Sequence, residues 1–326
     1  MNTLVEAIKE PLFSIVVPVY NGGIYFETCL NSVLNQTYQN WECIINNNLS
    51  EDDSLKIANQ FAAKDSRFKV FTNKKFLKMT DNWNEGCYKI DKSSKYLKVL
   101  GADDWLFPEC TEKTVELMEK YPSVGICSSY RLTDTLVELD GLNIWDGNVY
   151  NGKDILYKQL TRDLDISGSN TSVTFAIDHL KRIPRFPTVF DNTTYHEDTE
   201  LEYEIMNISD VGFVFQVLTY TRRHELSDTS RNVFRYNTLL QFDEKVLWLY
   251  KGNDKKLNKL YRKCRLNFAY FLFYKAVTFD WASIRWHKQY IVRKFKLTEY
   301  ILGILLCNKI SKLLRKITNK FLGIKK

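Results

Sequence analysis

Two adjacent carboxylates, Asp103 and Asp104, come two residues after an apolar-rich stretch over residues 95–100. The stretch is typical of a strand, so the pair stands at the carboxyl end of that strand. Like charges repel, and burying either one is costly without a partner. A divalent cation held by oxygen ligands removes both problems, and a cation beside a diphosphate is a common way to cleave an activated nucleotide. The alternative is a solvated turn with a helix N-cap, because a helical pattern opens at Pro108.

Alternating strand and helix patterns run through residues 13–130. Strands are predicted over 13–17, 41–45, 68–71, 95–100 and 124–129, and helices over 23–36, 50–64, 80–89 and 109–120. This alternation predicts an α/β fold with a mostly parallel sheet and helices on both faces. Ligands of such sheets bind beyond the carboxyl ends of the strands, which is where the polar clusters at 18–21, 46–48 and 103–104 fall.

The pattern weakens between residues 133 and 190, apart from a predicted strand over 172–177. A helix is then expected over 196–207 and a strand over 211–220, and every segment past residue 234 has a helical pattern. The expected organisation is a catalytic domain over 1–230, with a nucleotide half over about 12–130 and an acceptor half over about 131–230. A helical region over 231–326 completes the chain.

The chain has 326 residues and a net charge of +7, and its basicity is concentrated at one end. Residues 281–326 hold twelve lysines and arginines and one acid, a net charge of +11, so residues 1–280 carry −4. A nucleic-acid enzyme more often carries its positive charge around the active cleft, so no nucleic-acid partner is expected.

Seven scattered cysteines without a C-x-x-C pair argue against a disulfide framework or zinc ribbon and favour a reducing cytoplasm. No signal peptide and no transmembrane helix are expected.

The segment P-V-Y-N-G-G-I-Y-F-E-T-C-L-N-S-V-L-N-Q-T-Y-Q-N-W-E, residues 18–42, resembles the N-terminal signature of the family 2 glycosyltransferases. The resemblance continues, in order, through S-E-D-D (50–53), N-W-N-E-G (82–86), A-D-D-W (102–105), H-E-D-T-E-L (196–201) and Y-T-R-R-H (220–224). The resemblance covers roughly residues 12–230, and within the family the chain is similar to bacterial surface-polysaccharide glycosyltransferases. It implies a GT-A fold, a nucleotide-sugar donor, Mn²⁺ or Mg²⁺, and inversion at the anomeric carbon.

For the donor and metal, the resemblance implies Asp103 as a metal ligand and Asp104 as an assisting or ribose-binding group. His224 is an implied second metal ligand, although a lone histidine is more often structural. Arg222 suits the diphosphate oxygens. The implied residues around base, ribose and donor pocket are Pro18, Tyr20, Asn21, Asn47, Asp52, Asn82 and Asn84.

Two positions depart from the family pattern. Gly101 replaces its first acidic residue, and Asn47 replaces the aspartate that accepts the N–H of uracil. The resemblance favours a UDP-sugar, but an asparagine can donate as well as accept, so the base stays open. Ordinary turn chemistry is the alternative for Asn46–Asn48, and a helix N-terminus is the alternative for Asn82 and Asn84.

Inverting transfer needs a general base near the acceptor hydroxyl, opposite the leaving diphosphate. By resemblance Asp198 is the base and Glu197 a positioning neighbour. The alternative is an acidic first turn for the following helix.

The segment 299–322 carries apolar residues at helical spacing with basic residues mostly off that face. It predicts an interfacial helix on an anionic membrane, or alternatively a helix packed on the catalytic domain.

The expected activity is metal-dependent, inverting sugar transfer to a glycan, with an acceptor anchored to lipid at the inner face of the bacterial plasma membrane. A catalytically inactive sugar-nucleotide-binding or scaffold protein is the alternative. A nucleotidyltransferase is less favoured, because the 18–23 loop lacks lysine and arginine.

Overall fold

The computed structural model describes residues 10–138, 142, 147–164, 166, 169–183, 196–223 and 235–277. The chain divides into two compact units, residues 1–230 and 231–326. The described part of the second unit consists of α9 (Arg235–Tyr250) and α10 (Lys255–Val277). None of the helices in the described part of the chain is long and apolar enough to cross a membrane.

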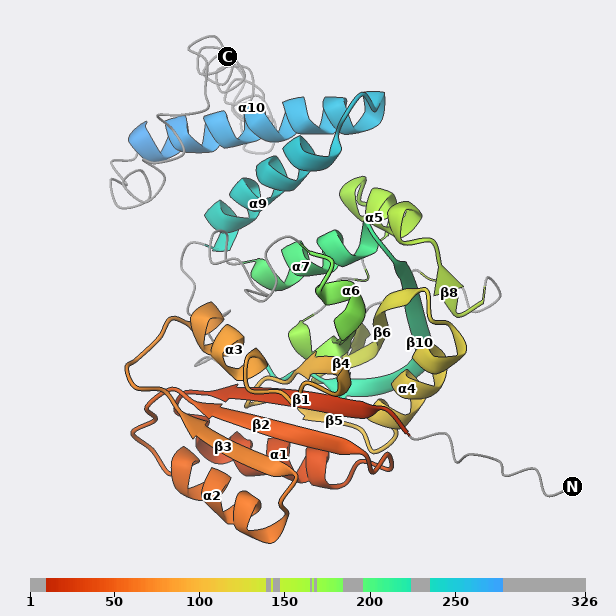
Figure 1. Ribbon diagram of the computed structural model, residues 1–326. Coiled ribbons are helices and arrows are strands. Elements are labelled where there is room, and N and C mark those ends of the chain that lie inside the picture. Colours follow the sequence, from red (N-terminus) through yellow and green to blue (C-terminus); the bar gives the residue numbers. More distant parts are fainter. Residues whose placement is uncertain are drawn as a thin grey trace, which may run out of the picture. The chain divides into compact units, whose positions relative to one another are not determined.

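The first unit alternates strands and helices in its N-terminal half (Figure 1). These elements are β1 (Leu12–Val19), η1 (Gly23–Tyr25), α1 (Phe26–Leu34), β2 (Trp41–Asn47), α2 (Ser54–Lys64), β3 (Phe68–Thr72), α3 (Met79–Cys87), β4 (Ser94–Val99), β5 (Trp105–Leu106), α4 (Cys110–Lys120) and β6 (Val124–Thr133). The remaining elements are β7 (Leu136–Glu138), β8 (Val149–Tyr150), α5 (Gly152–Leu160), η3 (Asn170–Ser172), β9 (Val173–Ala176), α6 (Ile177–Leu180), α7 (Glu197–Met206) and β10 (Asp210–Tyr220).

The strands form one sheet in the order β3-β2-β1-β4-β9-β6-β10-β5. Strands β1 to β4 run parallel, and β6 is parallel to β10. Strand β9 is antiparallel to both β4 and β6 and thereby joins the two halves of the unit. The predicted α/β fold with a mostly parallel sheet is confirmed. The carboxyl ends of β1, β2, β3 and β4 lie at one edge, as predicted, because parallel strands must end on the same side.

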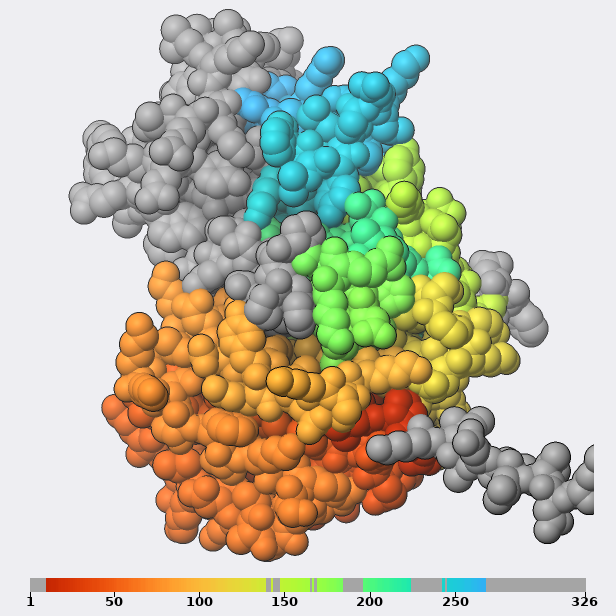
Figure 2. All heavy atoms as spheres, in the orientation of Figure 1, coloured from red at the N-terminus to blue at the C-terminus, as the bar shows by residue number. Residues whose placement is uncertain are grey.

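Helices cover both faces of this sheet (Figure 1). Alternate residues of a strand point to opposite faces, so the odd-numbered positions of β1 enter the core cluster that α1 and α2 complete. The even-numbered face carries α3, whose Gly86 lies directly against Val16. The space-filling view shows the segments from β1 to α3 in direct contact with those from α4 to β10, so the two halves share one continuous surface (Figure 2).

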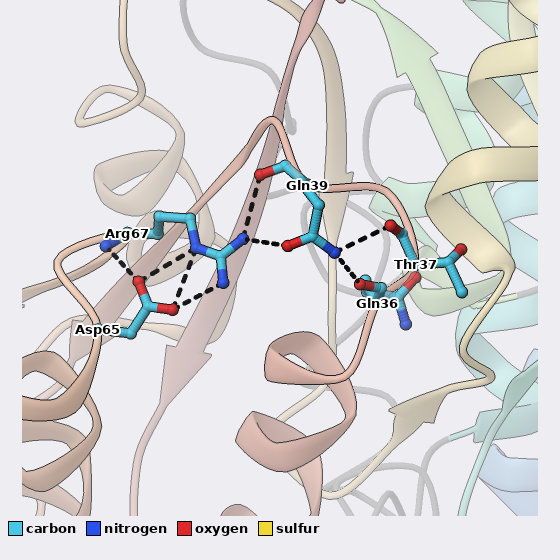
Figure 3. A network of polar contacts seen from close by, with 5 residues as sticks. All are labelled: Gln36, Thr37, Gln39, Asp65 and Arg67. Atoms are coloured by element: carbon cyan, nitrogen blue, oxygen red, sulfur yellow. Dashed lines mark hydrogen bonds and ion pairs between the residues drawn. The ribbon is translucent and has the colours of Figure 1, made fainter.

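A polar network ties the amino-terminal ends of β2 and β3 together, away from the edge that holds the candidate site (Figure 3). The Arg67 guanidinium donates to Asp65 from Nη2 at 2.7 Å and to Gln39 from Nη1 at 3.1 Å, and it stacks on Trp41 at 3.8 Å. The Gln39 amide in turn donates to two backbone carbonyls of the turn after α1. These contacts fix the start of β2 and so set the strand register that places its carboxyl end at the site.

The segment 133–183 differs most from expectation. Helix α5 and the short strands β7 and β8 lie where the sequence pattern is weak. Strand β5 was not expected either, because two residues are too few to give a period. Strand β9 is confirmed within the predicted range 172–177.

The close approach of α3 to β1 yields the first testable prediction. A Cβ atom on Gly86 would lie 2.5 Å from Val16 Cγ1 and 3.3 Å from Asn46 Cβ. Gly86→Ala is therefore expected to lower the free energy of unfolding by on the order of 2 kcal/mol, despite the better helix propensity of alanine. Denaturant unfolding measures this loss. The Gly86→Ala/Val16→Ala double variant should lose less stability than the sum of the losses in the two single variants, because Val16→Ala removes the clashing Cγ1 atom. Strict additivity would contradict the contact.

Candidate functional site

The Asp103–Asp104 pair lies on a turn that directly follows β4. The Leu100 amide extends the β4–β1 pairing by donating to the Val16 carbonyl at 2.8 Å, and the Asp104 amide closes the turn onto the Gly101 carbonyl at 3.0 Å. The turn therefore stands at the carboxyl edge of the sheet, between the loops that follow β1 and the segments that flank β9 and β10.

Asp104 is buried and anchored on both carboxylate oxygens. Thr171 Oγ1 donates to its Oδ2 at 2.5 Å, and the Arg222 amide donates to its Oδ1 at 2.9 Å. Burial, together with the charge of Asp103, raises the pKa of Asp104 to about 7, although these two hydrogen bonds and the charge of Arg131 oppose the shift. Asp104 thus fixes the turn from within the protein, and the turn carries Asp103 at its less buried position.

The raised pKa of Asp104 predicts how stability depends on pH in the metal-free protein. An aspartate ionises near pH 4 when unfolded but near pH 7 here, so between these values only the unfolded state releases the proton. The free energy of unfolding should fall by on the order of 2 kcal/mol from about pH 4.5 to 7.5, relative to Asp104→Asn. Denaturant titrations across this range measure the difference, and parallel pH profiles for the two proteins would contradict the shifted pKa.

The geometry of the turn gives a reason for the glycine at position 101, where the family pattern has an acidic residue. A Cβ atom on this residue would lie 2.9 Å from Asp104 Oδ2 and 3.1 Å from Asp103 Oδ1. The two carboxylates therefore fold back over a position without a side chain, and an acidic residue there would require the turn to open. The Gly101 amide also donates to Thr171 Oγ1 at 3.2 Å, so the same hydroxyl holds both ends of the turn.

Strand β5 brings two distant motifs together at this edge. It pairs antiparallel with the end of β10, with Trp105 opposite Tyr220. The two rings stack 3.6 Å apart and nearly parallel. The A-D-D-W and Y-T-R-R-H segments, expected separately from the sequence, thus form one structural unit.

Arg222 is held next to the acidic turn by several contacts. Its Nε donates to the Asp103 carbonyl at 3.2 Å, and its guanidinium lies 3.9 Å from the centre of the Tyr25 ring and 5.1 Å from that of Trp105. Within the described part of the chain, no hydrogen bond reaches its two Nη atoms. A guanidinium oriented by aromatic rings, with two donor atoms available beside Asp103, is suited to binding phosphate oxygens.

The loops that follow β1 and β2 are joined by hydrogen bonds. Asn21, which has a positive φ of 51°, accepts from the Glu51 amide through Oδ1 at 2.8 Å. Asp52 accepts from the Gly23 amide at 2.9 Å and from the Ser54 amide at 3.0 Å. Burial opposes ionisation of Asp52, but the hydrogen bonds outweigh it and lower the pKa of this carboxyl. Asn21 and Asp52 thus shape the mouth of the expected donor pocket by tying its two loops together, while Pro18 lies within β1, opposite Asn46 of β2.

Buried asparagines form an amide network between β2, the loop after β3, and α3. Asn46 Nδ2 donates to Asn82 Oδ1 at 2.8 Å, and Asn73 Nδ2 donates to the same atom at 2.7 Å and to Asn48 Oδ1 at 2.9 Å. Asn47 is buried too, and its Oδ1 accepts from the Ser50 amide at 3.1 Å. The network makes Asn82 a structural link of the pocket wall.

The remaining donor-side residues lie on the same edge or behind it. Asn84 is buried on α3. Tyr20 is 47% exposed, and its ring meets that of Phe76, 59% exposed, edge to face at 4.8 Å. An exposed aromatic pair at the carboxyl ends of β1 and β3 can stack on a planar base.

Glu197 and Asp198 occupy the first turn of α7, the helix that was expected over 196–207. Glu197 is buried, whereas Asp198 has intermediate exposure. Burial of its carboxyl group raises the pKa of Asp198, and hydrogen bonds from Thr199 together with the charge of Arg131 oppose the shift. A carboxylate with a raised pKa is a more effective proton acceptor than an ordinary one.

Two further residues of the site were not singled out in the sequence. Thr171 anchors the acidic turn from η3, and Arg131 on β6 lies within electrostatic reach of both Asp104 and Asp198. Arg131 also forms an ion pair with Glu138 at 2.5 Å. No sequence signal marks either residue, because each is brought to the site by pairing between strands far apart in the chain.

Metal coordination rests on few protein groups in the described ranges. They contain no cluster of three or more His, Cys, Asp or Glu side chains that could hold a metal ion. Mg²⁺ bound with a nucleotide typically uses one or two carboxylates plus phosphate oxygens, so Asp103 on its fixed turn fits such an ion. His224 and the segment 299–326 lie outside the described residues.

Comparisons with known proteins agree with this architecture. The family model for glycosyl transferase family 2 matches residues 14–178, about half of the chain. An uncharacterized glycosyltransferase of Haemophilus influenzae is 34% identical over 122 residues, which is 37% of this chain and 36% of that protein. The chain thus spans about a third of the length of that relative.

Two solved structures share the fold. S. aureus TarS 1–349 in complex with UDP-GlcNAc has a TM-score of 0.59 at 13% identity, and the match covers 77% of this chain and 71% of the TarS chain. The mannosyltransferase PcManGT of Pyrobaculum calidifontis, solved with GDP-Man and Mn²⁺, has a TM-score of 0.58 at 14% identity, with coverages of 96% and 84%. Together with the family match, this confirms the predicted family and GT-A fold: the chain belongs to glycosyl transferase family 2.

Proposed function

We propose that the protein is a metal-dependent, inverting glycosyltransferase that moves a sugar from a nucleotide-sugar donor to a hydroxyl of a glycan acceptor. The observation that carries this proposal is the rigid turn after β4. There, Asp104 is fixed on both oxygens, Asp103 is carried beside it, and the Arg222 guanidinium is held next to Asp103. Such a pairing of carboxylate and guanidinium matches a cation and a diphosphate bound side by side.

The residues have distinct roles in this proposal. Asp103, with His224 as a second ligand, would hold Mn²⁺ or Mg²⁺, which when bound neutralises charge that develops on the leaving diphosphate. Arg222 directs its Nη atoms to the diphosphate oxygens. Asp198 accepts the proton of the acceptor hydroxyl as the oxygen attacks the anomeric carbon, and the bond to the diphosphate breaks on the opposite face. Glu197 positions Asp198.

The donor pocket is proposed at the joined loops after β1, β2 and β3. Tyr20 would stack on the base, and Asn47 would offer it an amide. Solved relatives bound to UDP-GlcNAc and to GDP-Man show that this fold accommodates either base, and a UDP-sugar is the donor we favour.

A screen of nucleotides tests the proposed activity. Thermal unfolding with UDP, GDP, CDP and their sugars, each with and without Mn²⁺, should reveal one nucleotide that raises the melting temperature only when the metal is present. Release of the free sugar or of nucleoside diphosphate then measures turnover. Metal-dependent binding without turnover for any donor and acceptor would support an inactive sugar-nucleotide-binding or scaffold protein instead.

We further propose that the acceptor is linked to lipid in bacterial surface-polysaccharide synthesis, at the cytoplasmic face of the membrane. The support is the net charge of +11 over residues 281–326 together with the helical spacing of apolar residues in the sequence over 299–322. Deleting residues 299–326 should abolish salt-sensitive sedimentation with vesicles containing anionic lipid. Unchanged sedimentation would contradict membrane association through this segment.

A further inference from the structure

Lys98 on β4 is buried with an exposure of 1%, although its side chain carries an ammonium group. No carboxylate among the described residues forms an ion pair with it. Burial lowers the pKa of Lys98, and two thiols nearby, Cys110 and Cys127, act in the opposite direction. A buried ammonium without an ion pair is costly for stability, so the contacts that it makes need a physical account.

The ammonium holds one short backbone segment. Lys98 Nζ donates to the Thr171 carbonyl and to the Val173 carbonyl, each at 2.9 Å. These carbonyls belong to η3 and to the first residue of β9, and η3 is only three residues long. Because so short an element makes few hydrogen bonds of its own, the lysine fixes its position relative to β4.

The same segment holds the acidic turn. Thr171 Oγ1 donates to Asp104 at 2.5 Å and accepts from the Gly101 amide at 3.2 Å. Lys98 lies on β4, which leads directly into that turn. The lysine therefore binds η3, and Thr171 of η3 binds the turn that follows the same strand. Displacement of η3 would release both the buried carboxylate and the turn.

We propose that Lys98 is a positioning residue: through η3 and Thr171 it fixes the Gly101–Asp104 turn and so presents Asp103 to the metal and diphosphate. The functional half of this inference rests on the proposed glycosyltransferase activity, whereas the structural half does not. The lysine acts through other residues and touches neither donor nor acceptor.

Amide hydrogen exchange of the metal-free protein tests the structural half. Lys98→Met removes the donor at nearly constant volume, and exchange of the peptide covering residues 100–105 should accelerate on the order of tenfold. Thr171→Val should do the same, and Thr171→Ser, which keeps the hydroxyl, should restore protection. Lys98→Gln keeps a donor on a shorter stem and is the second variant if Lys98→Met does not fold.

Glu42→Gln is the matched control. Glu42 is also a buried charged residue, but it lies at the opposite end of the sheet, where it accepts from Ser14 and Lys69. Its substitution should destabilise the protein while leaving exchange of residues 100–105 unchanged. Equal acceleration in Glu42→Gln and Lys98→Met, or no acceleration in Lys98→Met, would overturn the inference.

Titration calorimetry with Mn²⁺ and UDP tests the functional half. Lys98→Met should weaken Mn²⁺ binding in the presence of the nucleotide on the order of tenfold, whereas Glu42→Gln should not. Unchanged Mn²⁺ affinity in Lys98→Met would overturn the positioning role. If the wild-type protein binds none of UDP, GDP and CDP with Mn²⁺, the proposed function fails, and the exchange result still decides the structural half.

Discussion

Asp103→Ala is expected to lower kcat/KM for sugar transfer by about 10³-fold or more, because the developing charge on the diphosphate would lose its cation. The fold should survive, since the buried anchor of the turn is Asp104 and not Asp103. Binding of Mn²⁺ with the nucleotide should be lost in parallel, which calorimetry measures.

The matched control for this variant is Asp53→Ala. Asp53 lies on the β2–α2 loop near the same edge, but its side chain is 77% exposed and is paired only weakly, with Lys56 at 3.7 Å. We expect little change in stability or in activity from its removal. Metal-dependent turnover at the wild-type rate in Asp103→Ala would contradict the assignment of the metal ligand.

Asp198→Asn is the second variant with a large expected effect. An asparagine keeps the size of the side chain but cannot accept the proton of the acceptor hydroxyl, so kcat should fall by about 10³-fold, within the range of general-base catalysis. Donor and metal affinity should stay within about twofold of wild type, because Asp198 is not proposed to touch the diphosphate. Asp178→Asn, an exposed aspartate with a side-chain exposure of 83%, serves as the control.

The pH dependence of kcat provides an independent check on Asp198. A base must be ionised to act, and the raised pKa of Asp198 shifts the loss of activity at acid pH to higher pH than for an ordinary aspartate. Thr199 donates to Asp198 Oδ1 from its amide at 2.8 Å and from its hydroxyl at 3.4 Å, and these bonds favour the ionised form. Thr199→Val should therefore move the acidic limb further up in pH. A limb that stays in place would show that another group titrates.

Much of the N-terminal half of the fold follows from sequence periodicity. The alternation of apolar strands with amphipathic helices predicts the parallel strands β1 to β4, and parallel pairing then brings their carboxyl ends to one edge. Placement of the acidic pair on a turn after β4 follows from the same reasoning.

The contacts that give the site its geometry could not be predicted. Thr171 reaches Asp104 only because β9 inserts antiparallel between β4 and β6, and Arg222 reaches Asp103 only because β5 pairs with the end of β10. Both pairings join segments far apart in the chain. The pattern over 172–177 predicts a strand but not its partners, and β5 is too short to have a period. The asparagine network is likewise tertiary, since it links β2 to α3 through Asn73.

The most direct test of the central claim is a crystal structure of the protein with Mn²⁺ and the nucleoside diphosphate that the thermal screen identifies, with the metal located by anomalous scattering. The account predicts one manganese within about 2.3 Å of an Asp103 carboxylate oxygen and of oxygens of both phosphates, with Arg222 against the diphosphate. A nucleotide bound at this edge with no manganese at Asp103, or with the diphosphate remote from the turn, would contradict it.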